Sequence, residues 1–233
     1  MSELSREREP DLDRVWVGVA GQVWRRDPGR LERLAGRLLR SPGLARALLT
    51  TPSLLLPWLI ASIVVLGAGA AATLGTGQPL VALMAPALAA AAIAYAYGPG
   101  VDPAWELSCS MAVSDRMVLL VRALAVFGVN AALGLAASAA SGAAAALTFG
   151  WLIPMTAVCA LALAVATVAR SAAVGAAAGL GGWMITVLSG RVASGQFGAV
   201  VTGAALVLPY LAIALTCTAV AVYATRTPRG TPR

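Results

Sequence analysis

The chain has 233 residues, of which 59% are hydrophobic and only 12% are charged, and its formal net charge is +7. A mean hydropathy of +0.82 is far above that of soluble globular domains and predicts an integral membrane protein. Histidine and lysine are both absent from the sequence. Their absence excludes Ser-His and Cys-His catalytic pairs, the usual zinc sites and the phosphate-binding loop G-x-x-x-x-G-K-[ST] within these residues, so we expect neither an enzyme nor a metal site.

The first fifty residues are rich in Arg, Asp and Glu, which is unlike a removable signal peptide. We expect residues 1–50 to form a cytoplasmic N-terminal segment. Within it, leucines recur on one face of a helical pattern and arginines on the other, namely Arg30, Arg33, Arg37 and Arg40. This pattern is typical of a helix that lies in the membrane interface with its arginines toward anionic headgroups. The alternative is a solvated, charged helix packed on the same protein.

Six apolar stretches are long enough to cross a hydrocarbon core, which takes about 20 residues in a helix. The predicted spans are 53–74, 79–97, 117–138, 143–169, 171–189 and 198–224. The predicted fold class is therefore an all-α membrane protein. It has a six-helix transmembrane domain over 51–226, a cytoplasmic loop at 98–117 and a cytoplasmic tail at 227–233.

Arginine placement predicts the orientation of the spans in the membrane. With six spans, sixteen of the seventeen arginines fall on one side and Arg191 alone lies opposite. The excess of positive charge marks the cytoplasmic side, so both termini are expected there. The arginine-only basic set and the high alanine content suggest a bacterial source and hence the bacterial cytoplasmic membrane. No recognition fold presents these charges to nucleic acid, so we expect no nucleic-acid partner.

The predicted spans hold no acidic or basic residue at mid-membrane, which disfavours pumping by buried carboxylates. The remaining polar candidates for a substrate path are Asn130, Thr156, Thr167, Tyr210 and Thr216. The more conservative interpretation of most of them is hydrogen bonding between helices. Four prolines fall inside spans and are expected to kink them: Pro57, Pro86, Pro154 and Pro209.

Two glycines of the fifth span, Gly175 and Gly179, have the four-residue spacing that allows helices to approach closely. The partner helix could belong to the same chain or to a second copy.

The loop between the second and third spans holds the only acidic residues after Glu32, which are Asp102, Glu106 and Asp115. Asp102 followed by Pro103 predicts a helix start, and residues 103–112 allow at most three turns before Ser114 caps the next helix. A helix this short is marginal alone and gains stability by docking. Trp105, Leu107 and Met111 offer it apolar contacts. The alternative is that the acids only solubilise a turn and that Asp115 interacts favourably with the positive end of the third span.

The loop sequence resembles the cytoplasmic loop of the type-2 ABC transporter permease family. The matching residues are Glu106, Leu107, Ala112, Val113, Ser114, Arg116, Leu119, Leu120 and Arg122, with Ala112 where the family often has proline. The resemblance extends to the layout of an interfacial helix followed by six spans. It also implies short re-entrant helices near 189–208.

Membership of this family would make the loop a coupling helix, seated on a separate ATPase subunit that binds ATP and magnesium. The coupling residues would be Asp102, Trp105, Glu106, Leu107, Met111, Ser114, Asp115 and Arg116. The chain itself would bind no cofactor. It would pair with a second permease copy, identical or related, and export a hydrophobic or amphipathic substrate such as a lipid, peptide or antibiotic.

Two other function classes remain open. The chain could be a membrane-anchored regulatory or scaffold protein whose N-terminal segment binds a soluble partner. A secondary transporter is the third possibility. It would need inverted repeats and a discontinuous helix, and the two halves of the sequence show no convincing similarity.

Overall fold

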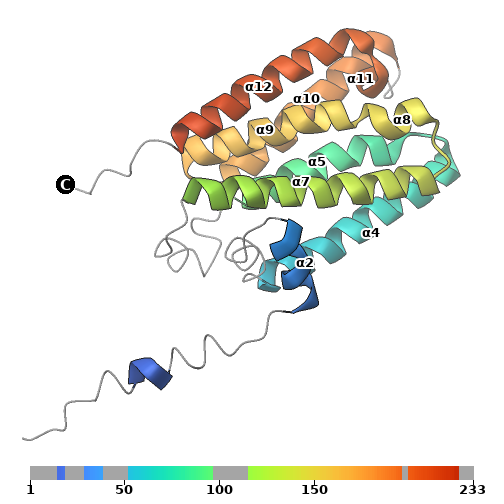
Figure 1. The fold of residues 1–233 in the computed structure, drawn as a ribbon. Coiled ribbons are helices and arrows are strands. Elements are labelled where there is room, and N and C mark those ends of the chain that lie inside the picture. The colour runs from blue at the N-terminus through green and yellow to red at the C-terminus, as the bar shows by residue number, and fades with distance from the viewer. Residues whose placement is uncertain (1–14, 19–28, 39–51, 97–114, 196–198, 226–233) are drawn as a thin grey trace, which may run out of the picture. The chain divides into compact units, whose positions relative to one another are not determined.

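The structure is a computed structural model that describes residues 15–18, 29–38, 52–96, 115–195 and 199–225 (Figure 1). Within these ranges every regular element is a helix, which agrees with the predicted all-α class. The chain divides into two units, Met1–Leu49 and Thr50–Arg233. In the first unit the structure describes a short helical stretch at 15–18 and helix α2, Arg30–Leu38.

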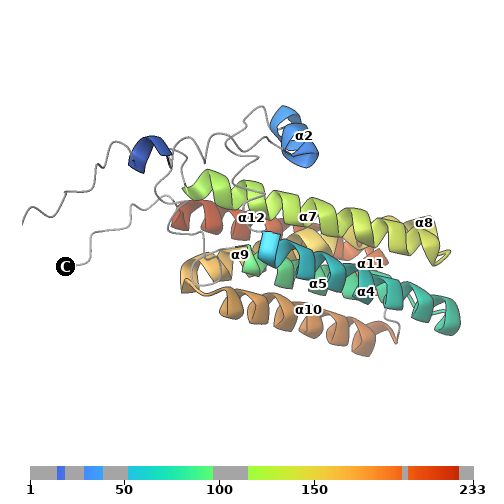
Figure 2. The ribbon, with the colours of Figure 1, turned by 90° about the horizontal axis from the view of Figure 1, so that it is seen from below.

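The second unit is a bundle of long helices whose axes run side by side (Figures 1 and 2). Its long helices are α4 (Pro52–Thr76), α5 (Leu80–Tyr95), α7 (Asp115–Ala140), α9 (Leu152–Ala169), α10 (Ala172–Ser194) and α12 (Val207–Ala224). Short helices α8 (Ala145–Gly150), α11 (Ala199–Thr202) and η1 (Ala204–Leu206) join them at one end. The long helices are apolar around most of their circumference, which is expected of helices that face lipid or a protein core rather than water.

Five helical segments of the described chain are long and apolar enough to cross a membrane. They mark the chain as a multi-pass membrane protein and coincide with five of the six predicted spans. The exception is the stretch 79–97, where α5 has 16 residues. Such a helix rises about 24 Å, short of a hydrocarbon core of about 30 Å. The six-span layout therefore remains a prediction.

Two of the predicted spans are broken by a short helix near their first residues. The stretch 143–169 divides at Trp151 into α8 and α9, and the stretch 198–224 divides into α11, η1 and α12. In both cases a proline is the third residue of the long helix, Pro154 in α9 and Pro209 in α12. Proline has no amide hydrogen to continue a helix from the preceding turn, but it fits a first turn well. The structure therefore places an interruption of the helix next to each of these two prolines, whereas Pro57 and Pro86 lie inside α4 and α5.

Helix α10 is longer than the sequence suggested. The fifth span was predicted to end at 189, but the helix continues to Ser194 and ends at Gly195, whose φ is 71° and whose amide donates to the Arg191 carbonyl at 2.8 Å. Gly190 is a packing position, because a Cβ there would collide with the Val200 side chain of α11. The short helix α11 thus packs closely against the last turns of α10.

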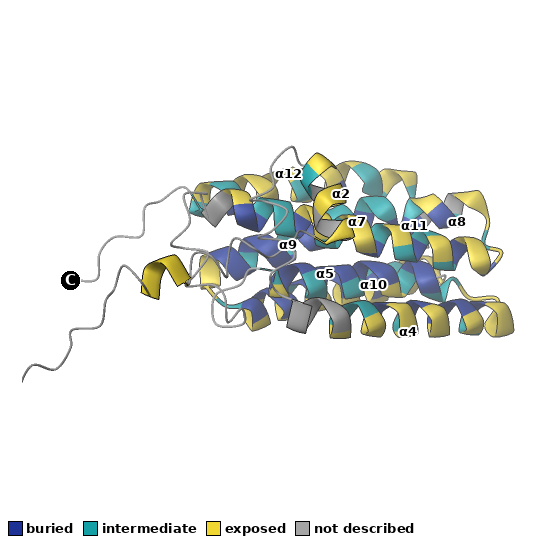
Figure 3. Ribbon diagram, turned by 60° about the horizontal axis from the view of Figure 1, so that its bottom comes forward, coloured by how far each residue is buried: buried dark blue, intermediate teal, exposed yellow. Residues whose placement is uncertain are grey.

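Helices α5 and α9 form the core of the bundle (Figure 3). Helix α5 packs against α4, α7, α9 and α10, while α9 packs against α5, α10 and, most extensively, α12. The inward side of α5 consists largely of alanines such as Ala85, Ala89 and Ala90, all of which are buried. Small side chains let the neighbouring backbones approach closely, which is how helices gain packing energy in a lipid environment.

A two-residue turn makes α9 and α10 an antiparallel hairpin. Arg170 ends α9 in the left-handed conformation, with φ 53°, and Ser171 caps α10 by accepting a hydrogen bond from the Val174 amide at 3.4 Å. A Cβ on Gly175 would lie 2.5 Å from the Ala166 Cβ, and one on Gly179 would lie 2.9 Å from the Ala162 Cβ. The partner of this glycine pair is therefore within the same chain.

Candidate functional site

The coupling segment predicted at 102–116 lies largely outside the described residues. Of its eight proposed coupling residues, Asp102, Trp105, Glu106, Leu107, Met111 and Ser114 are not described, and Asp115 and Arg116 are described only as the first two residues of α7. The predicted cap at Ser114 lies outside the described residues. The segment connects α5, which is described to Ala96, with α7.

The proposed interfacial anchor falls partly on described residues. Arg30, Arg33 and Arg37 lie on α2 and are exposed, as is Leu34, while Arg40 is outside the described residues. The helix therefore exists where the leucine and arginine pattern predicted it. Its placement at a membrane surface stays a prediction.

Four of the five polar residues proposed for a substrate path bond to carbonyls of their own helix. Asn130 Nδ2 donates to the Val126 carbonyl at 2.9 Å. The three threonines likewise donate their hydroxyls to carbonyls three or four residues earlier in the same helix; they are Thr156, Thr167 and Thr216. The expectation that most of these side chains link separate helices was therefore wrong. A hydroxyl on a helix can reach the preceding turn without any partner helix.

Tyr210 is the one proposed path residue that bonds to another element. Its hydroxyl donates to the Val200 carbonyl of α11 at 3.2 Å, and the side chain is buried. Val200 is itself 1% exposed and packs against Gly190 of α10. Tyr210 thus fastens α11 to the first turn of α12, which is a structural role at the end of the bundle.

The structure also buries polar groups on α4 and α7 that are not among the predicted site residues. Ser62 of α4 is fully buried, and Ser138 of α7 lies two turns beyond Asn130 on the same face and is 2% exposed. Among the described residues, Ser62 Oγ and Asn130 Oδ1 have no hydrogen-bond partner. Their burial could be foreseen only with knowledge of which faces of α4 and α7 turn inward.

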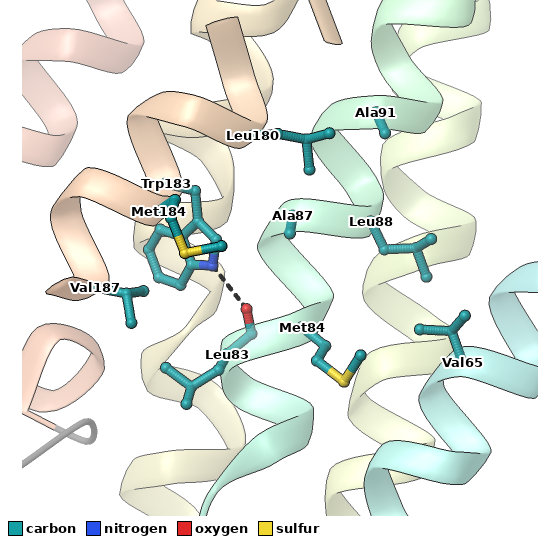
Figure 4. Close-up of a pocket in the computed structure, with 10 residues that line it drawn as sticks. All are labelled: Val65, Leu83, Met84, Ala87, Leu88, Ala91, Leu180, Trp183, Met184 and Val187. Atoms are coloured by element: carbon teal, nitrogen blue, oxygen red, sulfur yellow. Dashed lines mark hydrogen bonds between the residues drawn. The ribbon is translucent and has the colours of Figure 1, made fainter. Parts of the chain in front are cut away.

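An apolar groove with a volume of about 440 Å³ lies between α4, α5 and α10 (Figure 4). Ten residues line it. Val65 comes from α4, five come from α5 between Leu83 and Ala91, and four come from α10 between Leu180 and Val187. None of the five proposed path residues is among them. We call this hollow the α4/α5/α10 groove.

One hydrogen bond crosses the base of the α4/α5/α10 groove. The indole Nε1 of Trp183 on α10 donates to the Leu83 carbonyl of α5 at 2.7 Å, and the ring is 3% exposed (Figure 4). Leu83 lies three residues before Pro86, whose missing amide loosens the hydrogen bonding of this part of the helix. In the sequence, a tryptophan near the middle of an apolar span was the signal for this hydrogen bond, because a buried indole needs an acceptor.

The described residues hold no group of three or more His, Cys, Asp or Glu side chains that could bind a metal. Comparisons of the chain with protein-family models, curated proteins and solved structures found no match. The function must therefore be inferred from the residues themselves. They form an apolar helical bundle with a hydrocarbon-like groove near its middle and a polar, acid-containing segment between α5 and α7.

Proposed function

We propose that the chain is the permease subunit of an ATP-driven exporter of the type-2 ABC kind. In this proposal the segment 102–116 docks on a separate ATPase, which binds ATP and magnesium. The similarity of residues 106–122 to the loop of that family supports the assignment. So does the chemistry of the chain, which has neither the lysine of a phosphate-binding loop nor a histidine for general base catalysis.

The observation that carries the proposal is the position of this segment between α5 and α7. Helix α5 packs against α4, α7, α9 and α10, so it contacts four of the other five long helices. A displacement of the segment by a soluble motor would therefore act directly on the central helix of the bundle. Coupled motion of packed helices is an ordinary way to open and close a path through a membrane domain.

The cargo in this proposal is hydrophobic or amphipathic. Three arginines of the bundle lie near helix ends: Arg122 in the second turn of α7, Arg170 at the end of α9 and Arg191 in the last turn of α10. The buried interior of the described bundle consists mainly of alanine and larger apolar residues, with a few hydroxyl groups. Such walls suit a lipid, a hydrophobic peptide or an antibiotic better than an ion, whose charge would need compensating groups.

Replacing Glu106 tests the coupling. In the proposal, Glu106→Ala removes one charge from the docking surface and Glu106→Lys reverses it. For the reversal we expect about a tenfold loss of ATPase association, because like charges at an interface cost on the order of 1.4 kcal/mol or more. The matched control is Glu9→Ala, an acidic residue outside the segment. Co-purification of the ATPase and export are measured beside membrane insertion. Normal association and export in both Glu106 variants would refute the proposal.

The second candidate, a membrane-anchored scaffold, is favoured by the division of the chain into two units at Leu49 and Thr50. A scaffold of this kind would use the exposed Arg33 and Arg37 of α2 to hold a soluble regulator. Identification of the soluble chain that co-purifies with the full-length protein separates the two functions. An ATPase with a phosphate-binding loop supports the exporter, whereas a partner without one that is lost in an Arg33→Glu, Arg37→Glu variant supports the scaffold.

A further inference from the structure

We propose that the α4/α5/α10 groove binds one acyl chain of a membrane phospholipid at mid-depth of the bilayer. The proposal depends on the membrane-spanning character of the bundle and not on export. It assigns the groove a resident lipid chain that helps to hold α4 and α10 against α5.

The groove lies near the middle of all three helices that line it. Val65 is at the centre of α4, Leu83 to Ala91 span the central turns of α5, and Leu180 to Val187 lie at the centre of α10. In a membrane these positions are level with the hydrocarbon core, remote from headgroups and water. At this depth the groove opens toward the apolar interior of the bilayer, so molecules that enter it from the side are apolar.

The lining offers nothing for a polar group to bind. Of the ten side chains, only the Trp183 indole carries a strong hydrogen-bond donor, and that donor is already used by the Leu83 carbonyl at 2.7 Å. A headgroup, a sugar or an ion in the groove would lose its hydrogen bonds to water without replacement, which costs several kcal/mol. A hydrocarbon chain loses none.

The size of the groove favours a single chain over a second copy of the protein. A stable protein interface takes about 20 to 30 residues on each side, whereas ten line the groove. A volume of about 440 Å³ is within the range of about 300 to 1,000 Å³ typical of sites for one small ligand. The groove is thus too small to serve alone as an oligomer interface.

The residue types in the walls of the groove also favour a hydrocarbon chain as the occupant. Helices associate in lipid mainly through small residues, and α10 directs its small pair, Gly175 and Gly179, inward against α9 and α5. The mouth of the groove carries Met84, Leu180 and Met184 instead, each between 41% and 59% exposed. Methionine is flexible and polarisable and adapts to a ligand without a fixed shape, as an acyl chain is. The groove is therefore built for a hydrocarbon chain, which the bilayer supplies at high concentration.

Photo-crosslinking of the wild-type protein gives the first test. The full chain is purified in detergent, supplied with phosphatidylcholine that carries a diazirine at the middle of one acyl chain, and irradiated. Adducts are located by mass spectrometry. We expect them mainly on the groove residues Met84, Leu180 and Met184. Equal labelling of the exposed α12 residues Leu208 and Leu215 would overturn the proposal, because it would mean unselective contact with lipid.

A groove-filling variant gives the second test. Ala87→Phe places a ring in the groove, and Ala219→Phe makes the same change on the exposed side of α12. Native mass spectrometry should show one retained phospholipid per chain in the wild type and in the control, and about tenfold less in Ala87→Phe. Equal lipid retention in Ala87→Phe would overturn the proposal. So would loss of a dimer by this variant with no change in bound lipid, since the occupant would then be a second copy.

Thermal melting of both variants separates lipid loss from misfolding. Should Ala87→Phe fail to fold, the crosslinking pattern of the wild type decides the question, because it requires no substitution. Neither test requires an ATPase. A failure of lipid binding would therefore leave the exporter proposal standing, and a failure of ATPase association would leave the lipid proposal standing.

Discussion

Replacement of Gly175 by alanine is the sharpest test of the packing between α9 and α10. The new methyl group would lie 2.5 Å from the Ala166 Cβ and 2.6 Å from the Ala162 carbonyl oxygen. Carbon atoms pack best at about 3.5 to 4.0 Å, so the two helices would have to separate by about 1 Å. The neighbouring atoms belong to backbone and to alanine, which have no side-chain freedom with which to yield.

The expected magnitude follows from two opposing terms. Overpacking of a tight site costs about 1 to 3 kcal/mol. Alanine is a better helix former than glycine by about 1 kcal/mol, which offsets part of that cost. We expect a net loss of about 1 to 2 kcal/mol in the free energy of unfolding. For a chain of this size the loss corresponds to a fall of roughly 2 to 8 °C in melting temperature.

Gly181 provides a matched control on the same helix. A Cβ at this position would meet nothing within 4 Å, so Gly181→Ala has the gain in helix propensity without the collision. Both variants are melted in the same detergent and followed by circular dichroism. The reasoning predicts a lower melting temperature for Gly175→Ala and an unchanged or higher one for Gly181→Ala. If Gly175→Ala melts at or above the temperature of Gly181→Ala, the close approach of α9 and α10 is refuted.

Two further variants test individual hydrogen bonds. Trp183→Phe removes the bond to the Leu83 carbonyl and should cost about 0.6 to 1.5 kcal/mol in unfolding free energy. The control is Trp58→Phe, because the indole nitrogen of Trp58 has no partner among the described residues. This substitution should lower the free energy of unfolding by less, as followed by circular-dichroism melting. Equal losses in the two variants would argue that the Trp183 bond is not stabilising. Tyr210→Phe frees the Val200 carbonyl and should speed amide exchange over 199–206 about fivefold, a change of about 1 kcal/mol. Unaltered exchange there, measured by mass spectrometry, would show that Tyr210 does not hold α11.

Hydropathy predicted the existence of the long helices because each needs enough apolar residues to cross a membrane. The pattern could not predict where Trp151 interrupts the fourth span. That break depends on Pro154 being the third residue of a new helix rather than an interior residue of an old one. In an evenly apolar stretch both arrangements have the same composition, and contacts with other helices decide between them. The same reason explains why α10 runs past Gly190 to Ser194.

Some features of the candidate sites could be predicted from the sequence and others could not. The spacing of Gly175 and Gly179 indicated close packing, but only the structure identifies Ala162 and Ala166 of α9 as neighbours. Thr156 and the other residues proposed for a substrate path were predicted from their polarity alone, and most of them form hydrogen bonds within their own helix. The α4/α5/α10 groove had no sequence signal except Trp183, because its walls are ordinary apolar residues brought together from three helices.

The turn at Arg170 and Ser171 has a consequence for how the protein is made. Because only two residues connect them, α9 and α10 become neighbours as soon as both have been synthesised, and little chain entropy is lost when they pair. The contact along Gly175 and Gly179 is therefore expected to form early. The other helices of the bundle would then assemble on the surface that this pair presents.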